Sequence, residues 1–510
     1  MKKNVVCYQF WMDYTLPVFI LLHVCVFMEI FDTKKNIIVY INNLPRSGVT
    51  AVKKLEQIRN EKLFIMLLRD SRRRKTVNDE AADYTLDIDF SNQSQIARSL
   101  LPYFNRLLAI TCRSESNIAR FISVIPHVPY LATTSTQSLE WASDKYEMRK
   151  RFKIFDSEHT PRFTLVKSYA KTERERVIKK VGFPMIIKPT NLAGSALVSV
   201  CYHEEELEKT LRRSFRRLRS IYSRDSRIEI PRLMAEEYIE GTMYSIDSYV
   251  DNQGNVTHCP IVRVKTGKDV GHDDFYNYLR ITPTKLKPSS VQLAQERAEI
   301  GIKALGLRNI TTHTELFHID GDWKIIEIGP RIGGHRHELH RLSCDINHSL
   351  NDILTRIPGK KPDIPKKCKG YAAVMRYYAS KEGIVEQLNG IRKIQDLKSF
   401  KNIDVKVKVG DRVYFAKHGG AGVFDLTLYN DEYSKLLADI RHVEQMVNIG
   451  IKNRRKKVNQ SVIGAKKVAK STVSKKLSAT TETSAQSVAK SPEKKATTKV
   501  IKKTSKKTTS

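Results

Sequence analysis

The chain has 510 residues and a formal net charge of +34, much of which lies at its C-terminal end. Its apolar fraction of 41% is sufficient for packed cores, so most of the chain is expected to be globular, in roughly two to four domains. Seven cysteines are scattered along it without a CxxC spacing. This pattern argues against a disulfide framework or a zinc cluster and favours a reducing, cytoplasmic compartment.

An apolar leader occupies residues 1–33. Residues 14–31 are nearly all apolar and follow Lys2 and Lys3. Their length is marginal for a membrane span, which requires about 20 residues, and no small-residue cleavage site follows. Two interpretations stay open: a membrane anchor with the catalytic domain on the cytoplasmic side, or a leader that precedes a true start at Met28.

Residues 34–140 are expected to form an N-terminal parallel α/β domain. A β-branched segment, NIIVYINN, begins at Asn36, and two further apolar segments, KLFIMLLRD and LLAITCRSE, follow with helical patterns between them. Strands that alternate with helices predict a parallel sheet. The loop at 45–48, PRSG, lies at the first strand-to-helix junction, where such folds bind ligands, although it lacks a full G-x-G-x-x-G.

Two further globular regions and a tail follow. Residues 141–357 mix helices and strands in the manner of an α+β core, and residues 366–450 predict a small C-terminal α/β subdomain. Residues 451–510 carry eighteen Lys and Arg against two Glu, a net charge of +16, and contain no aromatic residue. Such a segment cannot bury a core, so we expect a disordered basic tail.

A pair of glutamates indicates chemistry. Glu315 in THTELFHI and Glu327 in KIIEIGPRIGGH lie on two strand patterns separated by the turn signal DGD. A two-residue turn would place the side chains on opposite faces, whereas a three-residue loop or a bulge would make them direct cross-strand neighbours, with Cβ atoms about 5 Å apart. One loop residue should then be left-handed. Adjacent carboxylates repel unless a proton or cation lies between them, and hard oxygen ligands suit Mg²⁺. The alternative is two solvated glutamates on an edge hairpin.

Five sequence motifs, taken in order, resemble the ATP-grasp superfamily, most closely its carboxylate–amine ligases. They are SDKYEMRKRF, FPMIIKP, AEEYIEG, HTELF and IEIGPRIGG. Each motif alone is weak, but five in this order are specific. The resemblance covers residues 36–450 and implies an α/β fold: a pre-ATP-grasp domain at 34–140, an ATP-grasp core at 141–357 and a lid-like subdomain at 366–450.

The resemblance implies ATP as the nucleotide and Mg²⁺ or Mn²⁺ as the metal. Glu315 and Glu327 match the family's metal ligands. Lys145 and Lys188 match its phosphate-binding lysines. Arg331 would face the phosphates or a substrate carboxylate, so Lys188 and Arg331 are the expected catalytic groups.

Further residues would complete the nucleotide site. Gly194 and Ser195, in the loop LAGS, would bind a phosphate through a backbone N–H and a hydroxyl. Glu236 would accept from the adenine amino group. The backbone at Glu237 and Ile239 would supply the remaining hydrogen bonds to the base.

Two positions depart from the family pattern, and three are expected at the substrate. Met243 stands where the family often has an acid that holds the ribose, and Gly329 stands where it usually has an asparagine. Arg331, His335 and Arg336 are expected to line a substrate pocket, whose basic character would suit an acidic substrate.

The resemblance implies an ATP-dependent ligase that joins a small carboxylate to an amine through an acylphosphate and releases ADP and phosphate. Amino acids or small peptides are the expected substrates. The alternative is a nucleic-acid-associated protein with a degenerate nucleotide-binding core. The basic tail and the arginine-rich segment 212–219 favour it, as do Met243 and Gly329. The two are compatible if an enzyme core carries a tethering tail.

Residues 451–510 should confer salt-sensitive, nonspecific binding to nucleic acid. Lysine tails bind polyanions through counterion release, so the affinity should fall by orders of magnitude between low and physiological salt. Fluorescence anisotropy with labelled DNA and RNA checks this on the full chain and on a fragment of residues 28–450. A fragment that binds as tightly as the full chain would contradict the prediction.

Overall fold

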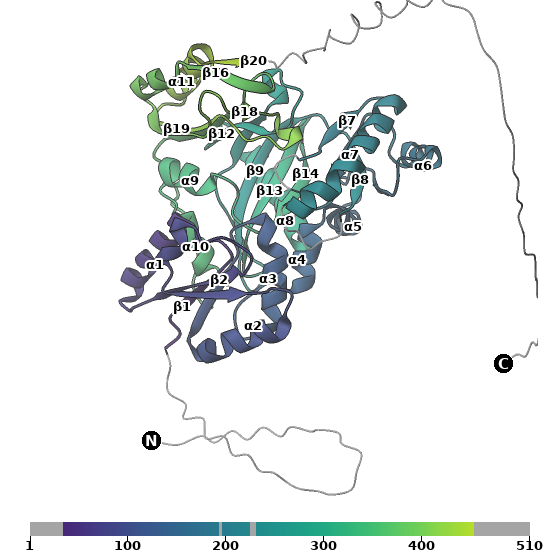
Figure 1. Ribbon diagram of the computed structural model, residues 1–510. Helices are drawn as coiled ribbons and strands as arrows, with labels where there is room; N and C mark the ends of the chain where they lie inside the picture. The colour runs from purple at the N-terminus through teal and green to yellow at the C-terminus, as the bar shows by residue number, and fades with distance from the viewer. Residues whose placement is uncertain (1–33, 193–195, 225–230, 453–510) are drawn as a thin grey trace, which may run out of the picture. The chain divides into compact units, whose positions relative to one another are not determined.

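The computed structural model describes residues 34–452 with the exception of 193–195 and 225–230 (Figure 1). All described residues belong to one compact unit. The expected leader at 1–33 lies outside the described residues, as do Gly194, Ser195 and residues 453–510 of the expected tail at 451–510. The first two residues of that expected tail, 451 and 452, instead belong to a strand at Asn448–Lys452. Within the described ranges, every helix is too short or too polar to cross a bilayer.

A four-stranded parallel sheet opens the described chain, as predicted, in the order β3-β2-β1-β4. Its strands are β1 (Ile37–Ile41), β2 (Phe64–Asp70), β3 (Tyr84–Ile88) and β4 (Leu107–Thr111). The helices of this region are α1 (Arg46–Arg59), α2 (Gln93–Leu100), α3 (Ile118–Val124) and α4 (Thr136–Ser143). Strand β1 is buried throughout, because its alternate side chains enter two cores, one with α1 and one with α2 to α4.

A smaller antiparallel sheet follows, in the order β5-β8-β6-β7. Its elements are α5 (Lys145–Phe155), β5 (Phe163–Val166), α6 (Lys171–Val181), β6 (Met185–Pro189), β7 (Ser199–Cys201), α7 (Glu204–Arg224) and β8 (Leu233–Glu237). Helices α6 and α7 pack on one face, where Met185 and Ile187 of β6 are buried. Since side chains alternate along a strand, Lys188 leaves the opposite face.

The largest sheet has nine strands in the order β14-β13-β9-β11-β12-β15-β19-β17, with β10 beside β9, and all of its pairs are antiparallel. The strands are β9 (Thr242–Val250), β10 (Val256–His258), β11 (Val262–Thr266), β12 (Asn277–Thr282), β13 (Ile310–Ile319), β14 (Asp322–Gly329), β15 (Tyr371–Tyr377), β17 (Phe400–Val405) and β19 (Phe424–Asn430). The helices are α8 (Pro288–Ala304), α9 (Arg336–Cys344), α10 (His348–Leu354) and α11 (Tyr433–Met446). Strands β16 (Gly383–Asn389), β18 (Arg412–Val413) and β20 (Asn448–Lys452) form a separate three-stranded sheet.

The region 366–450 continues the core sheet. Strand β15 pairs with β12 along four residues and with β19 along seven. The expected boundary between the core at 141–357 and the C-terminal subdomain at 366–450 therefore falls within one continuous sheet.

The hairpin of β13 and β14 pairs the two glutamates as direct neighbours, as predicted. Of the two expected alternatives, a three-residue loop or a bulge, the structure has the bulge, because Ile319 pairs with Asp322 across a two-residue turn. Both turn residues, Asp320 and Gly321, have positive φ angles of 48° and 89°, as a tight hairpin requires. A bulge beside Glu315 shifts the register by one residue and brings the carboxylates onto one face.

A disulfide joins Cys344, the last residue of α9, to Cys368. The scattered spacing of the cysteines predicted no such pair. The backbone explains the proximity: Lys369 N–H donates to the carbonyl of Ser343 over 2.6 Å, which draws the segment before β15 against the end of α9. The two cysteines are 24 residues apart and meet only in the folded chain, so their spacing in the sequence does not predict the bond.

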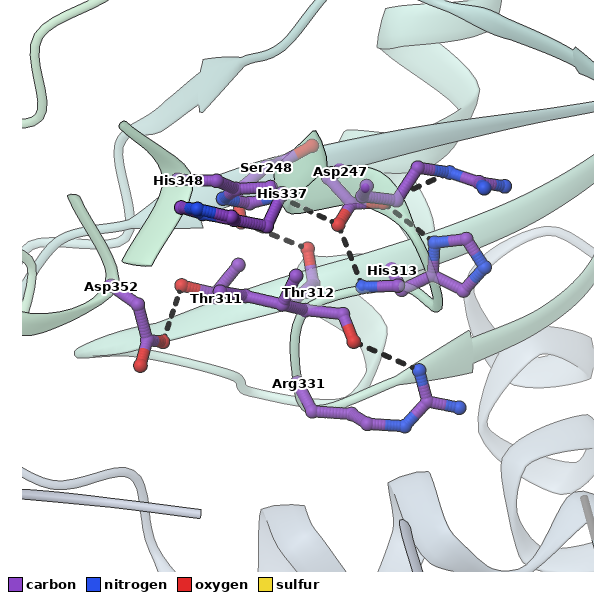
Figure 2. A network of polar contacts seen from close by, with 12 residues as sticks. Asp247, Ser248, Thr311, Thr312, His313, Arg331, His337, His348 and Asp352 are labelled. Atoms are coloured by element: carbon purple, nitrogen blue, oxygen red, sulfur yellow. Dashed lines mark hydrogen bonds and ion pairs between the residues drawn. The ribbon is translucent and has the colours of Figure 1, made fainter. Parts of the chain in front are cut away.

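Helix α10 joins the first sheet to the largest one. It packs against α1, beside which it lies in Figure 1. Its buried Asp352 accepts hydrogen bonds from Thr111 at the end of β4 (2.7 Å) and from Thr311 of β13 (2.6 Å). Arg356 lies 3.2 Å from the same carboxylate. One ionised side chain thus ties two sheets together, and Figure 2 shows its contact with Thr311.

Replacing Asp352 with Asn should loosen this junction. Burial alone would raise the pKa of Asp352, but Arg356 and Arg113 outweigh it and hold the pKa at about 2. A folded-state pKa below the unfolded value of about 3.9 stabilises the fold above that value, and the contribution disappears as the pH falls from about 4 to about 2. The free energy of unfolding at pH 7 should fall by about 2–4 kcal/mol.

Urea unfolding followed by circular dichroism between pH 7 and pH 2 measures the effect of Asp352→Asn. The variant should also lose less stability than the wild type between pH 4 and pH 2. Asp396→Asn, at an exposed position, is the matched control and should behave as wild type. An Asp352→Asn protein as stable as this control at pH 7 would contradict the assigned role.

Candidate functional site

The paired carboxylates each have a nitrogen partner from this chain. Lys145 Nζ lies 3.0 Å from Glu327 Oε2, and His313 Nε2 lies 3.3 Å from Glu315 Oε1. Burial alone would raise the pKa of Glu315, but His313 and Arg336 lower it to about 2. Glu315 is therefore ionised at neutral pH, which is the state a metal ligand requires.

Lys145 is fixed at the start of α5. The Asp144 side chain caps this helix by accepting from two backbone N–H groups. The Lys145 backbone N–H donates to the carbonyl of Thr190, and its ammonium donates to that of Leu192 over 3.0 Å. Burial by itself would lower the pKa of Lys145, but Glu327 and Glu115 outweigh this effect, so the pKa lies above its usual value. The lysine is a cation held against the end of β6.

Lys188 belongs to a buried charge cluster. Its ammonium lies 2.7 Å from Glu236 Oε1, and Arg149 binds both oxygens of the same carboxylate, over 2.7 and 3.1 Å. Burial would raise the pKa of Glu236, but Arg149 and Lys188 hold it at about 2. The Glu236 carboxylate, expected to accept from an adenine amino group, is thus already paired with two cations. The spacing of residues in the sequence did not predict these partners of Glu236.

The expected base-binding segment begins where β8 ends. The backbone N–H of Glu237 donates to the carbonyl of Arg162 over 2.8 Å, and the Glu237 carboxylate pairs with the Arg162 side chain. Glu237 therefore uses its N–H within the small sheet. Ile239 lies beyond the last residue of β8, so contacts of its backbone with a base stay a prediction.

A cleft of about 570 Å³ opens at the carboxyl ends of β1 and β4. Its walls come from three segments, 43–47, 113–115 and 331–338. Strands β1 and β4 are neighbours in the sheet, yet the helices that follow them pack on opposite faces. This is a topological switch point, where open α/β sheets bind ligands. The PRSG loop lines the cleft with residues 45–47, in keeping with the sequence-based expectation.

Arg331 connects the cleft to the carboxylate pair. Its Nε lies 2.8 Å from Glu115 Oε2, and both residues line the cleft. Burial would lower the pKa of Arg331, but Glu115, Glu327 and Glu315 raise it. The guanidinium therefore lies in the field of three carboxylates, which keep it charged.

Gly329 makes room for this ion pair. A Cβ at Gly329 would lie 3.2 Å from Oε2 of Glu115 and 3.7 Å from the guanidinium carbon of Arg331. The asparagine usual at this position in the family would therefore have to displace Glu115 or Arg331. The departure from the family pattern thus has a steric cause within this chain.

His335 and Arg336 have different surroundings. His335 lines the cleft, as expected, and its Nε2 lies 3.0 Å from Arg376. The expectation that Arg336 lines the pocket is wrong. Its side chain is 1% exposed and donates to Ser245 Oγ over 2.6 Å, because the first turn of α9 directs it toward β9.

Asp247 organises the buried side of the site (Figure 2). It is fully buried and accepts from the backbone N–H of Gly333 over 2.8 Å. His313 Nδ1 and His348 Nε2 lie 2.6 and 2.8 Å from its two oxygens. Asp247 thus links the Gly-Gly turn that lines the cleft to the histidine that contacts Glu315.

Sequence reasoning missed several residues of the cleft. Arg113 and Glu115 follow β4, while only the loop after β1 was identified as a ligand-binding junction. The segment RSE, directly after a buried strand, is a usable signal once β4 is known to lie next to β1. His337 and Glu338 also line the cleft.

Comparisons with known proteins agree with this architecture. Residues 181–338 match the ATP-grasp domain family. The alanine–anticapsin ligase of Bacillus amyloliquefaciens is 27% identical over 274 residues, which are 51% of this chain and 56% of that protein. The alignment therefore spans about half the length of this curated relative.

Two solved structures share the fold. An L-amino acid ligase from Bacillus licheniformis superposes with a TM-score of 0.68 at 18% identity, over 82% of this chain and 100% of its own. The biotin carboxylase domain of the Hydrogenobacter thermophilus 2-oxoglutarate carboxylase, solved with MgADP, gives 0.57 at 16% identity, over 81% of this chain and 91% of its own. The chain therefore contains an ATP-grasp domain and is a distant homologue of the alanine–anticapsin ligases.

Proposed function

We propose that this protein is an ATP-dependent ligase that joins the carboxylate of one amino acid or small acid to the amine of another substrate. The observation that carries the proposal is the side-by-side pair of Glu315 and Glu327, with Lys145 against it and Arg331 between the pair and the cleft. Two acids in such surroundings are costly unless they hold a cation.

The donor set fits Mg²⁺. Two carboxylates on one face are the hard oxygen ligands that Mg²⁺ prefers, with phosphate oxygens and water completing its shell. Glu315 and Glu327 would hold the ion, which would neutralise charge on the ATP phosphates. The MgADP bound to the biotin carboxylase domain supports this choice of nucleotide and metal.

Lys145 and Lys188 would bind phosphate oxygens. Each ammonium is now paired with a carboxylate, Lys145 with Glu327 and Lys188 with Glu236. Each lysine is also held by a strand or helix end, so little side-chain freedom remains to be lost on binding. A polyphosphate between the small sheet and the hairpin would give both cations a stronger partner.

The reaction proceeds in two displacements. A substrate carboxylate oxygen attacks the γ-phosphorus, and the bond to the ADP oxygen breaks, which forms an acylphosphate. The neutral amine then attacks the acyl carbon, phosphate leaves, and the amine nitrogen loses a proton. Arg331 would neutralise charge on the transferring group, which is the main task of a protein in phosphoryl transfer.

The cleft suits substrates that carry both charges. Glu115 can accept hydrogen bonds from an ammonium group, and Arg331, Arg46 and Arg113 can bind a carboxylate. The names of the relatives, alanine–anticapsin ligase and L-amino acid ligase, support amino-acid substrates. The alternative of a degenerate core that performs no chemistry loses support, because the close approach of Glu115 and Arg331 accounts for Gly329.

ADP release should depend on pairs of amino acids. The full chain is incubated with MgATP and pairwise mixtures of L-amino acids, ADP is followed with a coupled assay, and products are identified by mass spectrometry. Certain pairs should give one dipeptide per ADP. ATP hydrolysis without product in all pairs, or no ADP at all, would count against a ligase.

Glu115→Gln should separate substrate binding from nucleotide binding. The neutral amide removes the charge that would hold a substrate ammonium, so KM for the amino acid it contacts should rise about tenfold or more. The affinity for ATP, measured by calorimetry, should stay within about twofold. An unchanged KM for every accepted amino acid would show that Glu115 does not contact substrate.

Glu327→Gln should abolish turnover while it preserves the fold. A neutral amide is a poorer Mg²⁺ ligand than a carboxylate, so kcat should fall about 100-fold or more. Relief of the carboxylate repulsion alone would raise the metal-free stability slightly. Because Lys145 already pairs with Glu327, we instead expect a decrease of up to about 1 kcal/mol.

The control is Asp320→Asn, at the exposed turn of the same hairpin. Its positive φ suits asparagine as well as aspartate, so it should keep wild-type turnover and melting temperature. A Glu327→Gln enzyme that works at the wild-type rate under limiting Mg²⁺ would rule out the metal-ligand role.

A further inference from the structure

A second group of ligand-type side chains lies outside the cleft and apart from the glutamate pair. Cys259 follows β10, His340 lies in α9, and His348 begins α10. One ligand atom of each lies within 4.8 Å of those of the other two. The three residues are 1%, 0% and 0% exposed. Three segments distant in sequence thus bring a thiol and two imidazoles together in the interior.

His340 is the observation that points to a ligand. Both of its ring nitrogens are shielded from solvent and lack a hydrogen-bond partner among the described residues. Buried polar atoms are rarely left unpaired in native proteins. An unpaired imidazole nitrogen offers a lone pair to a metal ion.

His348 is oriented as metal-bound histidines usually are. Its Nε2 lies 2.8 Å from Asp247 Oδ2, and its Nδ1 lies 2.6 Å from Tyr249 Oη. Asp247, an ionised carboxylate, can only accept, so it takes the N–H of Nε2. The lone pair on Nδ1 accepts from the Tyr249 hydroxyl, a contact that a metal at Nδ1 would replace. A carboxylate that fixes the tautomer from behind is the common second partner of a zinc-bound histidine. Figure 2 shows His348 beside Asp247.

We propose that Cys259, His340 and His348 bind one zinc ion. A thiolate and two imidazoles are the mixed sulfur and nitrogen set that Zn²⁺ accepts in tetrahedral sites, unlike the all-oxygen set of Glu315 and Glu327. Binding converts the Cys259 thiol to a thiolate and releases one proton. With three protein ligands, a water would take the fourth position.

Such an ion would hold together the wall of the cleft. Helix α9 supplies His337 to the cleft, and α10 carries Asp352, which bonds to the first sheet. The connection after β10 is the third anchor. Zinc at their meeting point would set the position of both helices relative to the largest sheet, independently of any nucleotide.

Metal analysis of the full chain tests the proposal. The protein is produced with added zinc, desalted, and measured by mass spectrometry of the metal. About one zinc per chain should remain in the wild type and in Glu315→Gln, which removes an oxygen ligand of the other site. Cys201→Ala, at another buried free cysteine, is the matched control and should also keep its zinc. Cys259→Ser and His340→Gln should lose most of it.

Cobalt substitution tests the site without a mutation. Co²⁺ in the wild-type chain should give the near-ultraviolet charge-transfer band of a cobalt–thiolate bond and visible bands typical of tetrahedral cobalt. Removal of the metal with a strong chelator should lower the melting temperature of the wild type but not that of Cys259→Ser.

Three outcomes would overturn the proposal. One is a wild-type chain that holds less than about a tenth of an equivalent of zinc. Another is zinc that Cys259→Ser and His340→Gln retain in full. The third is a cobalt spectrum without a thiolate band, which would place the metal at the surface histidines or at the glutamate pair.

Discussion

The site depends on the need to compensate two carboxylates that lie side by side. The bulge in the β13–β14 hairpin places Glu315 and Glu327 on one face, where their repulsion must be offset. Lys145, His313 and Arg331 are arranged around them, each from a different segment. Because of these contacts, the start of α5, residue His313 of β13 and the turn after β14 all lie next to the glutamate pair. The arrangement that stabilises the pair without metal is also the one that would receive a polyphosphate and its cation.

Buried acids recur in this chain, and each joins two elements. Glu236 joins β6 of the small sheet to α5 through Lys188 and Arg149. Asp247 joins β9 to the turn after β14 and to α10. Asp352 joins α10 to both β4 and β13. A buried ion pair adds little net stability but is costly to break on one side. These acids therefore fix the relative positions of the elements they join more than they add to stability.

Two parts of the structure form the cleft: the parallel sheet and the turn after β14. The parallel sheet provides a switch point between β1 and β4, and the turn after β14 closes the cleft from the other side. Glu115 follows β4 of the parallel sheet and Arg331 lies in the turn after β14, so their ion pair joins the two walls of the cleft. Gly329 permits this contact because it has no side chain in the way. Under the proposed function, substrate recognition would therefore be divided between the domain that precedes the ATP-grasp core and the core itself.

The sequence by itself determined those features that depend on local pattern. Period-two and helical segments predicted the parallel sheet, and five ordered motifs predicted the ATP-grasp core. The roles of Lys145, Lys188, Glu315 and Glu327 in it stay predictions. These features are readable because strand alternation and motif order are properties of neighbouring residues. The same reasoning reached the cross-strand pairing of the two glutamates, but it could not choose between a longer loop and a bulge.

Only the tertiary structure decided which side chains meet across distant segments. The partners of Glu236, the inward direction of Arg336 and the Cys344–Cys368 disulfide all depend on packing between elements far apart in the chain. The cluster of Cys259, His340 and His348 has the same origin. Spacing along a sequence records contacts within one helix or hairpin, whereas contacts between elements follow from how buried surfaces fit, which no single segment encodes.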